Sequence, residues 1–287
     1  MVLPDFEYLV PKTIGEACNL LKELGPKAKV FAGCTDIIPP MRDKAFTVDY
    51  LIDLKHIDGL KYIKWDDEIG LQIGALTTLR EIETSPIVKE HNPTLAHACK
   101  VVASTQVRAK GTMTGNLCNA SPSADTPPTL LAQNAKVLVH GVNGERYIMM
   151  EDFNTGFKKT ALEPGEIVTG FVLKPLAPNE KTAYIKHAVR KAMDLAIIGV
   201  GCKITMDGDI CTDAKITLGA VAIKPIHAPT AEKLLIGKPI TDELLNEVSV
   251  AAMNDCSPIS DIRASAEYRK DMVRVFTKRA IKQALEA

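Results

Sequence analysis

The sequence has no excess of charge of either sign: 35 Lys and Arg residues balance 35 Asp and Glu residues over 287 positions. Because a chain without excess positive charge lacks bulk attraction for phosphate groups, we expect no nucleic-acid partner. Aromatic residues are only 5% of the chain, which predicts a core of mainly aliphatic side chains. The hydrophobic (46%) and charged (24%) fractions are those of an ordinary globular protein, which excludes disorder as the dominant state.

Long hydrophobic runs are also lacking. The longest apolar stretch, Leu195–Cys202, is far shorter than the ~20 residues that a membrane-spanning helix needs. The first residues, Met1-Val-Leu-Pro-Asp-Phe-Glu7, are acidic and are not followed by the apolar segment of a secretory signal. We therefore expect a cytoplasmic protein without a membrane span.

Metal-binding and common catalytic patterns are missing as well. The seven cysteines do not stand at the spacing of a zinc or iron–sulfur site, and the six histidines are scattered. We therefore expect no metal in this chain, and reduced, mostly buried thiols. The sequence has neither a GxxxxGK[ST] phosphate loop nor a GxSxG nucleophile motif. No acidic pair is placed for acid–base chemistry, so no catalytic residue is assigned.

Helix and strand signals alternate along the chain, which indicates a mixed protein of helices and strands. Thr13–Glu16 and Thr78–Glu81 have the pattern of capping boxes and predict the start of two helices. The turn pairs Asn143-Gly144 and Asp207-Gly208 predict tight hairpins.

The length suggests two domains, at roughly 100–200 residues per domain. Residues 176–180, flanked by Pro175 and containing Pro178, are the best candidate for a linker. Three strand-like runs follow, and then three helical segments, which predicts a small antiparallel sheet with a helical cluster. We therefore place a boundary near residue 177, between domains of residues 1–176 and 177–287.

Two stretches carry residues suited to binding. In Val30–Ile37 a buried strand runs into Gly33, where the backbone can approach a ligand closely and successive N–H groups can bind an anion. Taken alone, this stretch is more typical of an ordinary strand-to-loop turn. The second, residues 110–128, is rich in small and turn residues, and a structureless loop of this length in a compact domain is usually functional. Its glycines and threonines suit a backbone cradle for a pyrophosphate, although Asx and Ser/Thr turns alone can also build such a loop.

Both stretches together resemble one family, the FAD-binding (medium) subunits of molybdenum hydroxylases, such as the medium subunit of carbon monoxide dehydrogenase and the FAD part of xanthine dehydrogenase. Ala32-Gly-Cys-Thr-Asp36 is similar to the first loop of that family. Gln106–Asn116, followed by Ala120-Ser-Pro-Ser-Ala-Asp125, is similar to the second. Leu218-Gly-Ala220 and Ala266-Glu-Tyr-Arg269 extend the resemblance to the rest of the chain.

The resemblance implies an α+β fold. Residues 1–176 would form the two-part FAD-binding fold of the vanillyl-alcohol-oxidase type (also called the PCMH type), with a break between its parts near residue 54. Residues 177–287 would form a C-terminal flavoprotein domain with an antiparallel sheet and a helical cluster.

The resemblance also implies the cofactor and its contacts. The two loops would wrap the diphosphate of FAD, Asp125 would contact the adenosine side, and Val168 and Lys186 would lie near the adenine or the isoalloxazine. The implied cofactor-binding residues are Lys29, Val30, Phe31, Ala32, Gly33, Cys34, Thr35, Asp36, Ile37, Val102, Gly111, Thr112, Thr114, Gly115, Asn116, Asp125, Val168 and Lys186.

The sequence departs from the family pattern at two positions. Cys34 stands where the first loop usually has its second glycine, and Thr114 where the second loop usually has the first glycine of a pair. We expect both positions to have unusual backbone angles, at which a side chain costs free energy.

The function that the resemblance implies is electron transfer. Such a subunit takes electrons from the [2Fe–2S] clusters of a small iron–sulfur subunit, in a heteromeric complex whose large subunit holds molybdopterin. Its FAD passes the electrons to NAD, a quinone, a ferredoxin or oxygen. Two other interpretations stay open. One is a self-sufficient flavoprotein oxidoreductase, for which His187 and Arg190 would be the only hints of a substrate-side base. The other is a non-enzymatic partner module that has lost FAD, which Cys34 and Thr114 would favour.

Overall fold

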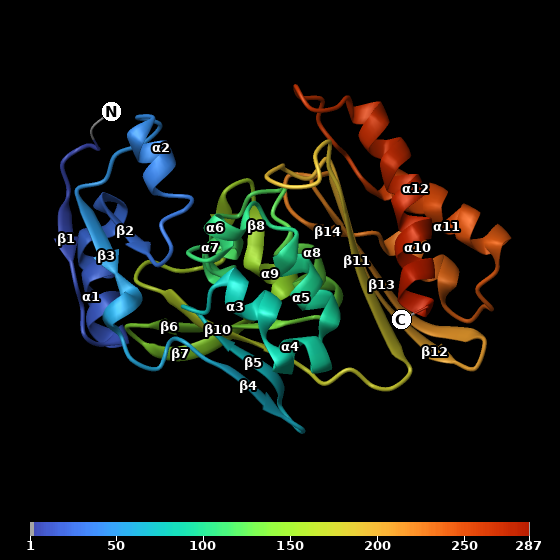
Figure 1. Cartoon of the computed structure of the whole chain (residues 1–287), viewed down its shortest axis with the longest axis horizontal. Helices are drawn as coiled ribbons and strands as arrows, with labels where there is room; N and C mark the ends of the chain where they lie inside the picture. Colours follow the sequence, from blue (N-terminus) through green and yellow to red (C-terminus); the bar gives the residue numbers. More distant parts are fainter. Residues whose placement is uncertain (1–2, 287) are drawn as a thin grey trace.

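The computed structural model describes residues 3–286, which form three bodies arranged in a row along the molecule (Figure 1). The first is a small three-stranded parallel sheet in the order β1-β3-β2. Its elements are β1 (Glu7–Leu9), α1 (Ile14–Leu24), the 3-10 turn η1 (Gly25–Lys27), β2 (Ala28–Phe31), α2 (Ile38–Arg42), β3 (Tyr50–Asp53) and the 3-10 turn η2 (Leu54–His56). Helix α1 packs its buried Ala17 and Cys18 into an aliphatic cluster with Ile52 of β3.

The second body is a five-stranded antiparallel sheet in the order β4-β5-β10-β6-β7, together with seven short helices. Its strands are β4 (Ile63–Asp66), β5 (Gly70–Gly74), β6 (Lys136–Gly141), β7 (Gly144–Met149) and β10 (Ile167–Leu173), with a small hairpin of β8 (Asn154–Gly156) and β9 (Lys159–Thr160). Its helices are α3 (Leu79–Thr84), α4 (Pro86–His91), α5 (Pro93–Lys100), α6 (Thr105–Arg108), α7 (Met113–Cys118), α8 (Thr126–Ala132) and α9 (Met150–Phe153).

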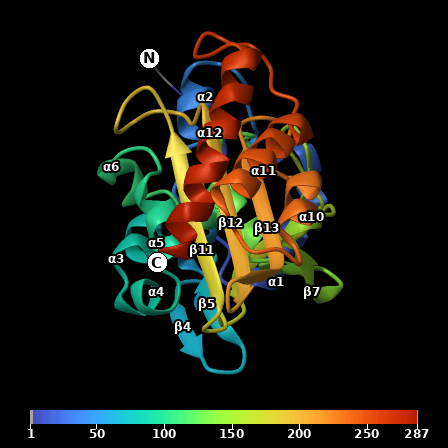
Figure 2. The ribbon, with the colours of Figure 1, turned by 90° about the vertical axis from the view of Figure 1, so that its right-hand side faces the viewer.

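The third body is an antiparallel sheet in the order β11-β12-β13-β14 with three helices. It comprises β11 (Glu180–His187), β12 (Ile198–Asp207), β13 (Ile210–Gly219), β14 (Ile226–His227), α10 (Pro229–Leu235), α11 (Asp242–Asp255) and α12 (Ala266–Leu285). The three helices cover the outer face of the sheet (Figure 2). Its inner face packs on α5 and α8 of the second body.

The backbones of β12 and α8 approach each other closely where the third body packs on the second. A Cβ atom on Gly201 would lie 3.0 Å from the Pro128 carbonyl oxygen, so a side chain there would push β12 away from α8. The Thr217 hydroxyl donates to the same carbonyl oxygen at 2.7 Å. The second and third bodies are therefore joined by buried polar contacts as well as by apolar packing.

The α+β class and the C-terminal antiparallel sheet with its helical cluster are confirmed. Both predicted hairpins occur, with Gly144 and Gly208 at positive φ. The capping box at Thr78 is complete. At Thr13 only half of it forms, because the Glu16 carboxylate accepts from the backbone N–H of Lys12 instead.

The prediction of one structureless loop over residues 110–128 is wrong. Helix α7 and the start of α8 lie within this stretch. The Thr112 side chain caps α7 by accepting from the N–H of Gly115, and prolines occupy the first turn of α8, where the missing N–H costs nothing. In the part of the chain that the structure describes, no helix is long and apolar enough to cross a membrane.

Candidate functional site

The two stretches singled out in the sequence lie against each other between the first and second bodies. A Cβ atom on Gly33 would lie 2.0 Å from the Lys110 carbonyl oxygen. A Cβ atom on Gly111 would lie 3.2 Å from the Thr35 hydroxyl oxygen. Glycine is required at position 33 because the backbone of Lys110 and Gly111 approaches it.

The first stretch turns sharply directly after β2. Cys34 has φ +61°, and its carbonyl oxygen accepts from the backbone N–H groups of Ile37 and Ile38 at 3.1 and 3.0 Å. The expectation of an unusual backbone angle is therefore confirmed at Cys34. It is wrong for Thr114, which lies inside α7 with regular helical backbone.

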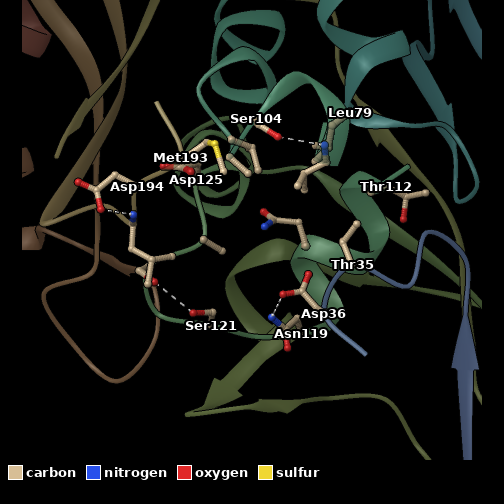
Figure 3. Close-up of a pocket in the computed structure, with 18 residues that line it drawn as sticks. Thr35, Asp36, Leu79, Ser104, Thr112, Asn119, Ser121, Asp125, Met193 and Asp194 are labelled. Carbon is tan, nitrogen blue, oxygen red and sulfur yellow. Dashed lines mark hydrogen bonds between the residues drawn. The ribbon is translucent and has the colours of Figure 1, made fainter. Parts of the chain in front are cut away.

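Two adjoining cavities flank the contact between the loops. The first, of about 340 Å³, lies between the second and third bodies, with Thr35 and Asp36 of the first body at one side (Figure 3). The second, of about 330 Å³, lies between the first body and α7. They share the lining residues Thr35, Asp36, Gly111, Thr112 and Asn119, so the place where the loops meet forms the wall between them.

A polar chain crosses from the first loop to the β8–β9 hairpin at this wall. The Asn119 side-chain amide donates to Asp36 Oδ1 at 3.0 Å, and Figure 3 shows these two side chains pointing toward each other. Lys158 Nζ donates to Asn119 Oδ1 at 2.6 Å. Burial raises the pKa of Asp36 above its ordinary value, and the Lys158 ammonium partly offsets that effect.

A buried ionic cluster closes the other end of the first cavity. Asp125 lines this cavity from the residue before α8 and accepts from the Tyr184 hydroxyl at 3.0 Å and from Lys186 Nζ at 2.8 Å. Lys186 also donates to the Val101 carbonyl oxygen at 3.0 Å. Burial raises the pKa of Asp125, against the effect of Lys186 and Tyr184. Because Tyr184 and Lys186 lie on β11, this cluster ties the third body to the cavity wall.

Most of the residues that the sequence predicts for cofactor binding lie around these cavities. The second cavity is lined by residues 29–37, Gly111, Thr112 and Gly115. The first is lined by Thr35, Asp36, Val102, Gly111, Thr112, Asn116 and Asp125.

Three of the predicted residues line neither cavity. The Lys186 ammonium reaches the site through Asp125. Val168 is 2% exposed in β10 and faces Val139 of β6 within the core. The Thr114 hydroxyl is buried without a hydrogen-bond partner among the described residues.

Sequence reasoning missed several residues that line the cavities. Asn119 lies within the second stretch, and its amide suits hydrogen bonding, so local composition could have indicated it. Lys158, which lines the second cavity, lies in the β8–β9 hairpin, and Met193, which lines the first, lies in the connection between β11 and β12. Both are distant in sequence from the two loops, and no local pattern marks them.

The two side chains considered as hints of a substrate-side base contact other protein groups. His187 Nε2 lies 3.1 Å from the Tyr268 hydroxyl, and its ring stacks on Phe276. The Arg190 guanidinium donates to the Met193 carbonyl oxygen and lies 3.5 Å from the Asp194 carboxylate. Neither His187 nor Arg190 is among the described residues that line the two cavities.

Comparison with known proteins covers almost the whole chain. The family model described as the FAD binding domain in molybdopterin dehydrogenase matches residues 4–174, and that of the CO dehydrogenase flavoprotein C-terminal domain matches residues 183–284. The chain is 34% identical to the glyceraldehyde dehydrogenase medium chain of Sulfolobus acidocaldarius over 283 residues, which cover 99% of each chain. It is 33% identical to the carbon monoxide dehydrogenase medium chain of Hydrogenophaga pseudoflava over 284 residues, 99% of this chain and 98% of the relative.

Solved structures show the same similarity in three dimensions. A chain of carbon monoxide dehydrogenase from Hydrogenophaga pseudoflava superposes with a TM-score of 0.96 at 33% identity, covering 100% of this chain and 99% of the other. A chain of quinoline 2-oxidoreductase from Pseudomonas putida 86 superposes with a TM-score of 0.93 at 28% identity, covering 100% and 99%.

Proposed function

This chain belongs to the family of FAD-binding subunits of molybdenum hydroxylases, and we propose that it takes electrons from the [2Fe–2S] clusters of a partner subunit and passes them to an external acceptor. Its partners in this proposal are a small iron–sulfur subunit and a large molybdopterin subunit. The structural observation that carries the proposal is the pair of cavities joined where the two glycine-containing loops meet.

The residues present fit an FAD. The two adjoining cavities suit an elongated ligand with two halves. Hydroxyl and amide groups of Thr35, Thr112 and Asn119 line both halves, and two lysines line the second one. Hydroxyls, amides and ammonium groups are the donors that ribose and phosphate oxygens accept from.

We propose that residues 29–37, Gly111, Thr112, Thr114, Gly115 and Asn116 hold the diphosphate and its neighbouring sugars, and that Asp125 contacts the adenosine side. Val102, Val168 and Lys186 would lie near the adenine or the isoalloxazine, Lys186 through its contact with Asp125. When bound, FAD supplies the ring that accepts and releases electrons, and the protein supplies its position and its electrostatic surroundings. The buried cluster of Asp125, Tyr184 and Lys186 would keep the third body fixed against the cofactor.

The proposed domains are residues 1–176 for FAD binding, in two parts that divide near residue 54, and residues 177–287 for the C-terminal flavoprotein domain. The chain between β10 and β11 contains the proposed boundary. The free thiols of the described chain support a reducing, cytoplasmic location for the complex.

An electron-transfer role fits the chemistry of the cavity walls better than substrate oxidation by this chain alone. His187 and Arg190 contact other protein groups, so the hints of a substrate-side base for a self-sufficient flavoenzyme find no support. Asp125, the carboxylate at the end of the first cavity, is bound to Lys186 and Tyr184.

A visible absorption spectrum of the purified chain, with the cofactor identified after acid release, tests the proposal. The expected result is stoichiometric FAD, followed by isolation of the chain with iron–sulfur and molybdenum subunits when they are co-expressed. A colourless chain that takes up no added FAD would overturn the flavin function and leave the non-enzymatic partner module. Turnover of a small substrate by the isolated chain would contradict the purely electron-transferring role.

A further inference from the structure

The two cavities differ in charge. The first is lined by the carboxylates Asp36, Asp125 and Asp194, of which Asp125 is paired with Lys186 and Asp194 with Arg190, and none of its described lining residues is basic. The second is lined by Lys29, Lys158 and Asp36. A negatively charged group placed where the loops meet is therefore stabilised from the side of the second cavity.

Lys158 is held in place over this cavity. It lies at the turn of the β8–β9 hairpin with φ +55°, a conformation that few residues with a side chain adopt. Its backbone N–H donates to the Ala120 carbonyl oxygen at 3.2 Å, which ties the hairpin to the second loop. Its ammonium donates to Asn119 Oδ1 at 2.6 Å, and Asn119 in turn donates to Asp36. The Lys158 ammonium therefore lies at the wall that the two cavities share.

The positive charge of Lys158 is incompletely balanced. Within residues 3–286 its ammonium contacts an amide oxygen and forms no ion pair with a carboxylate. Burial lowers the pKa of Lys158 below its ordinary value, Asp36 opposes that shift, and Lys29 adds to it. An ammonium has three N–H donors, so Lys158 retains donors for a ligand beside Asn119.

We propose that Lys158 binds the diphosphate of FAD, and that this contact makes the site favour FAD over flavins without phosphate. This inference rests on the proposed function. It adds a phosphate-binding side chain that lies outside both loops. Lys158 is better placed for this role than Lys29, whose ammonium lies 5.8 Å from the centre of the Phe46 ring, because, of these two described lysines, Lys158 alone is hydrogen-bonded to Asn119 in the wall that the two cavities share.

Equilibrium binding to the full chain freed of flavin tests the proposal, with FAD, ADP and riboflavin as probes. FAD and ADP carry the diphosphate and riboflavin carries no phosphate. Lys158→Gln removes the charge but keeps a polar side chain of similar length. Lys159→Gln is the matched control, because Lys159 is the next residue of the same hairpin, is exposed like Lys158 and lines neither cavity.

Lys158→Gln is expected to weaken FAD and ADP binding by about tenfold or more, as the loss of one charge-assisted hydrogen bond would. Its affinity for riboflavin should stay unchanged, Lys159→Gln should bind all three probes like the parent chain, and Lys158→Arg should restore most of the FAD affinity. Equal FAD affinity in Lys158→Gln and Lys159→Gln would overturn this inference and leave the proposed function standing. An equal loss of affinity for riboflavin and for FAD in Lys158→Gln would do the same. A parent chain that does not bind FAD would overturn the proposed function as well.

Discussion

Gly33 and Lys110 are in backbone contact: a Cβ atom on Gly33 would lie 2.0 Å from the Lys110 carbonyl oxygen and 2.6 Å from its carbonyl carbon. Such distances do not occur between real atoms, so any side chain at residue 33 forces the two loops apart. Since the two loops carry the residues that both cavities share, the shape of the cavities depends on how closely the loops approach each other.

Gly33→Ala is therefore expected to reduce both FAD binding and stability. Inserting a methyl group against a fixed backbone should lower the free energy of unfolding by roughly 1–3 kcal/mol, and the displaced loops should lose most of their FAD affinity. Thermal unfolding and FAD titration measure the two effects.

The control is Gly15→Ala in α1, where a Cβ atom would meet nothing within 4 Å. This change should leave FAD binding intact and raise the free energy of unfolding by up to about 1 kcal/mol, because alanine favours a helix over glycine. If Gly33→Ala behaves like Gly15→Ala, the close contact does not control the site.

The sequence predicts the parts of this site that local chemistry marks. Gly33 and Gly111 stand out because a turn at a strand end and a small-residue loop leave a signal in neighbouring residues. Helix α7 was missed because Gly115 and Asn116 are poor helix formers, and the cap provided by Thr112 outweighs them only in the folded loop.

Contacts across long separations could not be predicted in this way. Lys158 reaches the second cavity because the β8–β9 hairpin bonds to Ala120, and Tyr184 reaches Asp125 because β11 packs on the second body. These contacts follow from how the sheets are placed in space, which spacing within the sequence does not encode.

Cys34 gives a second prediction, because it holds a left-handed backbone conformation with φ +61°. That conformation costs a residue with a Cβ atom roughly 1 kcal/mol more than it costs glycine. Cys34→Gly should therefore raise the free energy of unfolding by up to about 1 kcal/mol, with FAD affinity equal or higher. Urea unfolding of the two chains measures this difference.

Cys34→Ala separates backbone strain from the thiol, since alanine keeps the Cβ atom and loses the sulfur. Cys34→Ala should therefore show no increase in the free energy of unfolding. Burial raises the pKa of the Cys34 thiol above its ordinary value, so replacing the sulfur should not remove a reactive thiolate. A gain in Cys34→Ala equal to that of Cys34→Gly would contradict the backbone explanation.

Tyr184 provides a third prediction, through its buried hydrogen bond to Asp125. Removing the hydroxyl in Tyr184→Phe leaves one oxygen of a buried carboxylate without its donor, which should cost about 1–3 kcal/mol of stability. Because Asp125 lines the first cavity, the absorption maximum of bound flavin should also shift.

Tyr147→Phe is the matched control for that change. Tyr147 is 57% exposed on β7, away from both cavities, and loss of its hydroxyl should alter stability and spectrum little. An unchanged flavin spectrum in Tyr184→Phe, with stability lowered as expected, would limit Tyr184 to a purely structural role.

Asp261 yields a prediction for the pH dependence of stability. Burial raises the pKa of this carboxyl, but the backbone N–H of Arg263, the Arg269 guanidinium and the N–H of Ala264 outweigh burial and lower the pKa to about 2. Arg269 is itself buried at the start of α12 and donates to the carbonyl oxygens of Ile197 and Ala220. The charge on Asp261 therefore holds α12 against the sheet of the third body.

A depressed pKa in the folded chain means that the stabilisation is fully present above the ordinary value of 3.8 and is lost as the pH falls toward 2. Asp261→Asn keeps an oxygen that accepts from the backbone but removes the charge. Its unfolding temperature should lie below that of the parent by a few degrees at pH 7, and the difference should shrink between about pH 4 and pH 2 as Asp261 of the parent becomes protonated. Calorimetry across this range measures the difference. If the difference in unfolding temperature between the two chains stays constant down to pH 2, the charge of Asp261 is not what holds Arg269 and α12 in place.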